Sequence, residues 1–125
     1  MPQTPDSPLA QDILERFSRY VRIHTTSRAG LDYRPSSSGQ NQLLDLLESE
    51  LDALGVTDRS RFDAGYLVAR IPAKGRNKAT AVGFLAHVDT SPDASGENVT
   101  PVVIERYDGG VIRPDGPNPI DPSEY

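Results

Sequence analysis

An uncharged run that ends abruptly in polar residues, from Thr80 to Asp93, constrains the fold of this chain more than any other feature. The run begins Thr-Ala-Val-Gly-Phe-Leu-Ala and continues His-Val-Asp-Thr-Ser-Pro-Asp. The apolar part of the run lies between Lys78 and Pro92. Its Val82 and Gly83 weaken a helical interpretation, so a strand covered on both faces is favoured. Such strands belong mainly to parallel or mixed α/β sheets. We therefore predict a buried strand that carries polar groups at its carboxyl end.

Two of these polar groups, His87 and Asp89, are spaced for joint action. Side chains two positions apart on a strand point to the same face, and ligands of open α/β sheets bind beyond the carboxyl ends of the strands. A metal-binding imidazole commonly passes its second ring N–H to a carboxylate, so His87 would bind a metal and Asp89 would orient it. The two residues alone favour a simpler interpretation, a structural hydrogen bond between a strand-end histidine and a turn aspartate.

Two helices are predicted before this strand. Ser7 and Pro8 are suited to a helix start, and apolar residues at helical spacing extend the first helix to about Ile23. Ser37 and Gln40 have the spacing of a capping box for the second helix. A stripe of leucines then marks its core-facing side, and Gly55 supplies its end. The stripe is formed by Leu43, Leu44, Leu47, Leu51 and Leu54.

Short strands complete the predicted fold. Strand-forming residues on either side of an Asp-Ala-Gly turn at 63–65 predict a hairpin of strands 58–62 and 66–71. After the central strand, further strands are predicted at 102–107 and 111–112. The basic stretch 74–78 is interpreted as a solvated loop. Helices followed by a hairpin, a buried strand and another strand form an α/β order with an incomplete sheet.

Composition excludes several classes of function. The 125 residues make about one small domain. Because 18 acidic residues outnumber 13 basic ones and no basic block occurs, nucleic-acid and anionic-membrane binding are not expected. The absence of cysteine excludes disulfides and thiolate metal sites, in agreement with a reducing cytosol. Neither a signal peptide nor a membrane span is evident, so a cytoplasmic protein is expected.

The run from Gly83 to Pro101, GFLAHVDTSPDASGENVTP, resembles the peptidase T family, which are tripeptide aminopeptidases among the co-catalytic zinc peptidases. Related deacetylases, dipeptidases and carboxypeptidases share the His-x-Asp core, but they usually continue differently. The stretch 35–40 is similar to the Pro-Ser-x-x-Gly-Gln of the same family. The resemblance covers essentially Leu9 to Tyr125, roughly the first third of such an enzyme. The chain is therefore expected to be an amino-terminal fragment.

The resemblance implies roles for the two site residues. His87 would be a zinc ligand, and Asp89 would be the catalytic-site residue that orients it. A complete site of this family holds two zinc ions, of which this chain would supply one ligand; the remaining ligands and the general base have no position in this sequence. No substrate-binding residue is assigned. The activity implied is release of the amino-terminal residue of a tripeptide, and the isolated chain is expected to be inactive.

The resemblance also implies a domain organisation. Residues 1–8 would be a disordered lead-in and 9–112 the amino-terminal part of a three-layer α/β/α catalytic domain. Residues 113–125, rich in proline, would be an irregular tail leading into the missing remainder. The partner of the complete enzyme would be a small peptide substrate, and a homodimer is compatible with the resemblance.

Two other functions remain open. The chain would be a non-catalytic binding or interaction module that keeps the front end of the fold, or part of another zinc amidohydrolase, such as a deacetylase or dipeptidase, that shares only the His-x-Asp strand. His24 is interpreted as a surface or capping residue near the substrate side. Asp93, Glu97 and Asn98 are interpreted as exposed turn residues, with contact to substrate or to a dimer partner as the alternative.

Overall fold

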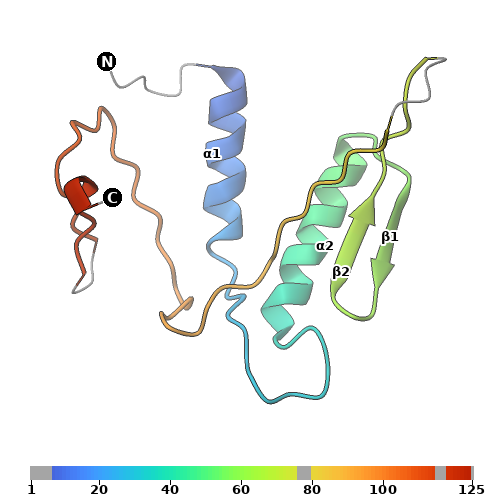
Figure 1. Ribbon diagram of the computed structural model, residues 1–125, viewed down its shortest axis with the longest axis horizontal. Coiled ribbons are helices and arrows are strands. Elements are labelled where there is room, and N and C mark those ends of the chain that lie inside the picture. Colours follow the sequence, from blue (N-terminus) through green and yellow to red (C-terminus); the bar gives the residue numbers. More distant parts are fainter. Residues whose placement is uncertain (1–6, 76–79, 115–117, 125) are drawn as a thin grey trace.

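The structure is a computed structural model that describes residues 7–75, 80–114 and 118–124. Its regular elements lie in the first part of the chain, and long extended segments follow them (Figure 1). Within the described residues the elements are helices α1 (Pro8–Tyr20) and α2 (Ser38–Ala53), strands β1 (Arg59–Phe62) and β2 (Tyr66–Ala69), and the 3₁₀ helix η1 (Pro122–Glu124). No helix in these ranges has the length and apolar character needed to cross a membrane.

Helix α1 begins as predicted. Ser7 is its N-cap and accepts a hydrogen bond from the backbone N–H of Ala10 at 3.2 Å, and Pro8 occupies the first turn. The helix ends at Tyr20, three residues before the predicted end. The apolar side chains Leu9, Ile13 and Phe17 are exposed, because nothing in the described chain covers this stripe.

Polar contacts, rather than an apolar interface, attach α1 to α2. The carboxylate of Glu50 accepts hydrogen bonds from Arg19 at 2.7 Å and from Arg16 and Tyr20. Only 14% of the Glu50 side chain is exposed. Burial alone would raise the pKa of Glu50, but the hydrogen bonds from Tyr20, Arg19 and Arg16 together lower it. The ionised form of Glu50 is therefore the one that joins the helices.

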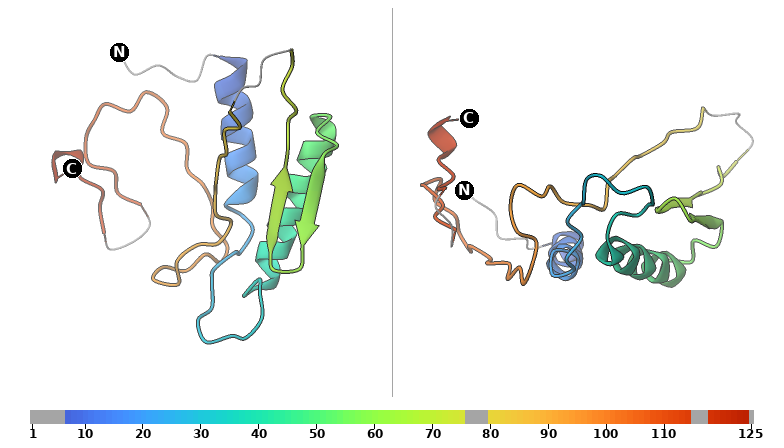
Figure 2. Two further views of the ribbon diagram at one scale, coloured as in Figure 1. Left: turned by 45° about the vertical axis from the view of Figure 1, so that its right-hand side comes forward. Right: turned by 90° about the horizontal axis from the view of Figure 1, so that it is seen from below.

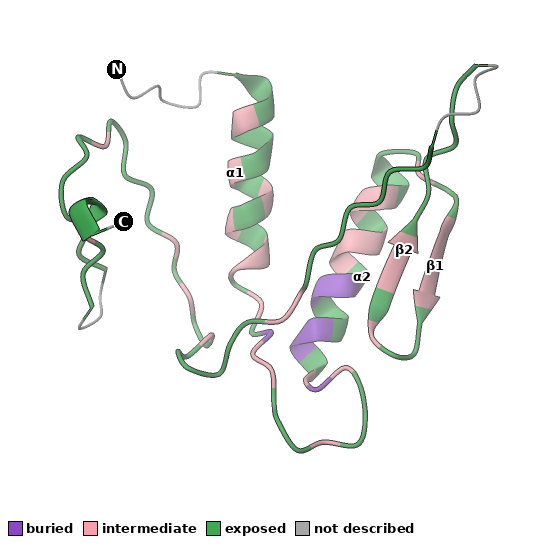
Figure 3. Cartoon of the chain, in the orientation of Figure 1, coloured by how far each residue is buried: buried purple, intermediate pink, exposed green. Residues whose placement is uncertain are grey.

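Helix α2 carries the small core of the described chain. Leu43 and Leu44 are buried near its amino-terminal end, and Leu54 at the other end is exposed (Figure 3). Gly55 follows the helix with a φ of 74°, a left-handed conformation that suits glycine, so the predicted end is confirmed. The predicted capping box is wrong. Ser37 is the N-cap, but its side chain makes no capping hydrogen bond, and the Gln40 side chain bonds Ser36 and Thr25 rather than the backbone N–H of Ser37.

The predicted hairpin is confirmed, with slightly shorter strands. β1 and β2 pair antiparallel from Arg59 opposite Ala69 to Phe62 opposite Tyr66. The rings of Phe62 and Tyr66 stack with their centroids 4.5 Å apart. Gly65 in the turn has a φ of 86°. Figure 2 shows the hairpin beside α2, with β2 in contact with the helix.

The prediction of a buried central strand is wrong for this chain. Residues 80–89 are extended but belong to no β-ladder among the described residues, and Val82, Phe84 and Leu85 are exposed. The physical reason is that no described strand lies alongside to pair with the backbone, and no described helix covers either face. Figure 1 shows this segment crossing the molecule as a bare extended trace.

The two later predicted strands are also absent as strands from the described chain. Residues 102–107 form no β-ladder in the described chain, so that strand is wrong. Of the predicted strand 111–112, Ile112 forms an isolated antiparallel bridge with Ile120. The mixture of helices and strands predicted for an α/β chain is confirmed, as two helices and one two-stranded sheet. The three-layer arrangement stays a prediction.

The two ends of the chain depart from their predicted descriptions. Pro8, assigned to the lead-in, belongs to α1. The tail is less irregular than expected, because it contains the bridge at Ile120 and the turn of η1. The predicted lead-in up to residue 6, residues 76–79, which include most of the basic loop 74–78, and residues 115–117 and 125 lie outside the described residues. The division into domains stays a prediction.

A candidate metal-ligand pair at His87

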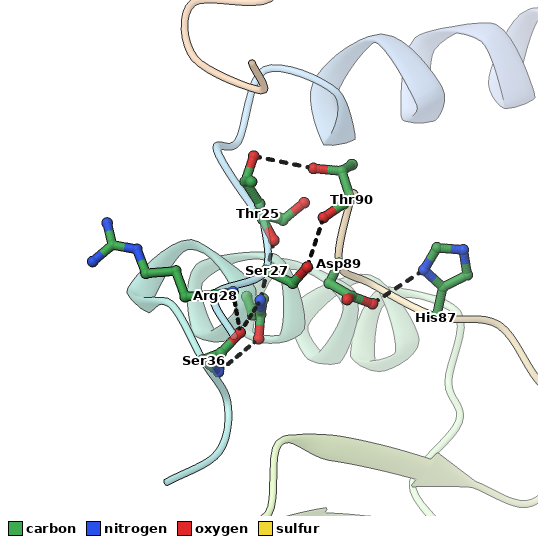
Figure 4. A network of polar contacts seen from close by, with 9 residues as sticks. Thr25, Ser27, Arg28, Ser36, His87, Asp89 and Thr90 are labelled. Atoms are coloured by element: carbon green, nitrogen blue, oxygen red, sulfur yellow. Dashed lines mark hydrogen bonds and ion pairs between the residues drawn. The ribbon is translucent and has the colours of Figure 1, made fainter. Parts of the chain in front are cut away.

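The extended segment brings His87 and Asp89 together as predicted, although no sheet supports it. Nδ1 of His87 lies 3.1 Å from Oδ1 of Asp89 (Figure 4). The His87 side chain is 82% exposed and that of Asp89 45% exposed. When Nδ1 carries the proton, it donates to Asp89 and leaves Nε2 with a free lone pair. This is the tautomer that a metal ion requires of an imidazole ligand bound through Nε2.

Contacts from another part of the chain hold the residue that follows the pair. The carbonyl oxygen of Thr90 accepts hydrogen bonds from the backbone N–H of Ser27 at 3.0 Å and from its hydroxyl at 3.2 Å. Thr26 and Thr90 form an isolated parallel bridge, and their hydroxyl oxygens lie 3.3 Å apart. We call residues 24–27 the linker, because they lead from α1 toward the turn before α2 (Figure 4). The linker thus fixes the end of the extended segment.

A cleft of about 770 Å³ lies beside the pair. Leucine side chains of α2 form much of one wall, and residues of the hairpin and of the extended segment contribute others. A volume of this order is typical of sites for small ligands. The lining includes Arg28, Leu44, Leu47, Tyr66, His87 and Asp89.

Comparison with known proteins connects this pair to a family. No protein-family model matches the chain. Over 100 residues, or 80% of its length, the chain is 45% identical to proteins named peptidase T from Salmonella arizonae, from Escherichia coli strain SE11 and from Escherichia coli strain K12 / DH10B. The chain is homologous to peptidase T. The resemblance inferred from the motifs is thereby confirmed.

The chain spans about a quarter of the length of these peptidase T relatives, since the match covers 24% of each of them. It therefore corresponds to one part of the longer relatives. The activity and partners of a whole peptidase T are taken up below as proposals.

The metal chemistry expected from peptidase T can be tested against the donor atoms present. A catalytic zinc usually takes three protein ligands and a water. Within the described ranges, no group of three or more His, Cys, Asp or Glu side chains is placed to hold a metal ion. The residues present therefore fit one imidazole ligand with an orienting carboxylate, as the sequence predicts, and they do not form a complete zinc site. The assignment of zinc itself stays a prediction.

The other candidate residues lie in or beside the loop that follows Thr90. Nδ1 of His24 is 3.6 Å from Oε1 of Glu97, and both side chains are exposed, so His24 is at the surface as predicted. Asp93 accepts a hydrogen bond from the Ser91 hydroxyl at 2.6 Å. Asn98 has a φ of 53°. Within the described chain, these residues make no hydrogen bond or ion pair with His87 or Asp89.

Sequence reasoning missed the role of Gln40. It was assigned to a capping box, but its side chain is buried and bonds Thr25 and Ser36 instead. The available signal was its place at the end of Pro-Ser-x-x-Gly-Gln, a family motif that contains no acid, base or metal ligand.

Proposed function

We propose that this chain is part of a zinc-dependent tripeptide aminopeptidase that releases the amino-terminal residue of tripeptides. The observation that carries the proposal is the 45% identity to proteins named peptidase T over 80% of the chain. The contact between His87 and Asp89 is the geometry that this function requires of a zinc ligand and the carboxylate that orients it. The absence of cysteine agrees with a cytoplasmic location, which is part of the same proposal.

In this function His87 is a zinc ligand through Nε2. The carboxylate of Asp89 accepts a hydrogen bond from Nδ1–H of His87, which fixes the ring's tautomer and orientation and makes the ligating nitrogen more basic. The chemistry that a zinc ion held there would supply is polarisation of the scissile carbonyl and a lowered pKa of a bound water. The remaining ligands and the general base would come from the portion of the enzyme that this chain does not match. A homodimer of the complete enzyme is part of the same proposal.

The isolated chain should bind zinc weakly and show no measurable peptidase activity. A lone imidazole lacks the chelation that gives zinc sites their affinity. In the described residues, no group of three or more possible ligand side chains is placed to hold a metal ion.

A chimaera provides the direct test. The matched residues of this chain replace their counterparts in peptidase T of Escherichia coli strain K12 / DH10B, and hydrolysis of tripeptides is measured with zinc content. The chimaera should cleave tripeptides, and His87→Ala should lose both zinc and activity. Asp89→Asn should keep the fold and weaken zinc binding by about 10 to 100-fold. Asp63→Asn, the same change in the exposed hairpin turn, is the matched control.

The outcomes separate the alternatives. A folded, zinc-loaded chimaera that leaves tripeptides intact but cleaves acylated amino acids would favour a deacetylase-type amidohydrolase. A folded chimaera that is inactive on both substrates would favour a non-catalytic module. Full activity in His87→Ala would refute the role of His87 as a ligand.

A further inference from the structure

We propose that Gln40 is a positioning residue for the His87–Asp89 pair and that it acts through the linker and Thr90. The inference rests on the proposed function in one respect, because it takes this pair as the zinc-binding end of the site. Every contact that carries it lies within this chain. Figure 4 shows the hydrogen bonds around Ser36, the linker and Thr90, and the separate contact of His87 with Asp89, which precedes Thr90 in the chain.

The Gln40 side chain is buried, with 5% of the residue exposed, and its side-chain hydrogen bonds are made with the segments before α2. Its Oε1 accepts a hydrogen bond from the backbone N–H of Ser36 at 3.0 Å. Its Nε2 donates to the carbonyl oxygen of Thr25 at 3.1 Å and to the Ser36 hydroxyl at 3.0 Å. Thr25 and Ser36 are themselves buried. A satisfied polar network of this kind fixes one arrangement, because breaking it leaves buried groups without partners.

The fixed linker in turn holds the end of the extended segment. Thr25 is bonded to Gln40, and the next two linker residues, Thr26 and Ser27, make the contacts with Thr90 described above. Thr90 follows Asp89 directly in the chain. In the described chain, residues 80–89 belong to no β-ladder. The contacts between the linker and Thr90 are therefore the nearest ones that fix the backbone beside Asp89.

Two glycines enclose the linker where a side chain would not fit. A Cβ atom on Gly39 would lie 1.8 Å from the carbonyl oxygen of His24. A Cβ atom on Gly96 would lie 2.6 Å from the Thr26 hydroxyl oxygen and 3.3 Å from that of Thr90. Gly39 lies in the stretch 35–40 and Gly96 in the run 83–101, so both of these segments approach the linker closely.

The consequence for the site is a chain of contacts from a helix to a metal ligand. Gln40 fixes the linker, the linker fixes Thr90, and Thr90 places Asp89 within reach of His87. Without the Gln40 amide, Thr25 loses its partner and the linker is free to shift. The carboxylate of Asp89 would then accept the hydrogen bond from Nδ1–H of His87 in a smaller fraction of molecules, and the population of the Nδ1–H tautomer would fall.

The test measures the neutral tautomers of His87 by ¹⁵N NMR of the metal-free 125-residue chain, at a pH where the ring is uncharged. In the unmodified chain, His87 should be mainly in the Nδ1–H form. Asp89→Ala should abolish this preference, and Gln40→Ala should shift the tautomer ratio in the same direction, toward Nε2–H, by less than Asp89→Ala does. Gln42→Ala changes an exposed glutamine of the same helix and should leave the ratio unchanged.

A second pair of variants avoids the buried position. Thr26→Val removes the hydroxyl that faces Thr90 but keeps the side-chain shape, and it should shift the tautomer ratio in the same direction. Thr26→Ser restores the hydroxyl and should return the ratio toward that of the unmodified chain. The ring contact of Phe62 with Tyr66 reports in each variant that the hairpin is intact. If the Gln40→Ala chain no longer shows the ring contact of Phe62 with Tyr66, the Thr26→Val and Thr26→Ser variants test whether the linker controls the tautomer ratio of His87.

Two results would overturn the inference. One is a tautomer ratio that responds to Asp89→Ala but not to Gln40→Ala or Thr26→Val in folded chains. The other is an unmodified chain without a preference for Nδ1–H. Neither reading depends on peptide cleavage, so a failure of the tripeptidase proposal in the chimaera would be recognised separately.

Discussion

Replacing Gly39 by alanine should destabilise the chain, although the same change in an ordinary helix is stabilising. Alanine is favoured over glycine within a helix by about 0.5 to 1 kcal/mol. Here the new Cβ would lie 1.8 Å from the carbonyl oxygen of His24, whereas Cβ atoms essentially never approach other atoms within 3.0 Å. The linker or α2 must therefore move by about 1.2 Å, the difference between these two distances.

The magnitude follows from what that movement breaks. The hydrogen bond from Gln40 to Thr25 is 3.1 Å long and does not survive a displacement of this size, and an unpartnered buried carbonyl costs about 1 to 3 kcal/mol. Overpacking adds about 1 to 3 kcal/mol. After subtraction of the helix gain, the free energy of unfolding should fall by about 1 to 5 kcal/mol.

Urea unfolding followed by far-ultraviolet circular dichroism measures this change. Gly83→Ala is the control, because its Cβ would meet nothing within 4 Å and its stability should change little. A Gly39→Ala chain that is as stable as the unmodified chain, or more stable, would refute the close approach of the linker to α2 and with it the basis of the positioning network.

Two further predictions concern elements outside the pair. Hydrogen bonds lower the pKa of Glu50 in the folded chain, so ionised Glu50 stabilises the fold fully above the ordinary glutamate pKa, and this stabilisation is lost as the pH falls through the lowered value. Nuclear Overhauser contacts between Tyr20 and α2 should disappear in that acid range. Their persistence there would contradict the role of Glu50 in joining the two helices. Gly65→Ala should destabilise the hairpin by about 1 to 2 kcal/mol, because φ is 86° and the new Cβ would lie 3.0 Å from Cβ of Pro35; an unchanged melting temperature would contradict this.

The sequence predicted those elements whose determinants are local. Ser7 and Pro8 define the start of α1, Gly55 defines the end of α2, and a three-residue turn with Gly65 defines the hairpin. Each of these depends on residues within a few positions of one another, so periodicity and turn chemistry were sufficient. The spacing of His87 and Asp89 likewise sufficed to predict their contact.

Elements that need distant partners were not predicted correctly. The apolar run around Phe84 has the composition of a buried strand, but burial requires neighbouring strands and covering helices, and the described chain provides neither. The misassignment of Gln40 has a related cause. A glutamine three residues after Ser37 fits a capping box equally well from the sequence, and only the long-range contact with Thr25 shows which hydrogen bonds it makes.

The central claim is that His87 offers one nitrogen to zinc while Asp89 holds the other. Titration of the 125-residue chain with zinc, followed by NMR of both histidine rings, tests it most directly, because exposed His24 serves as an internal control. We predict weak binding that perturbs the His87 ring before that of His24 and that is weakened further in Asp89→Ala. Tight one-to-one uptake, or equal perturbation of both rings that is unaffected by Asp89→Ala, would contradict the account.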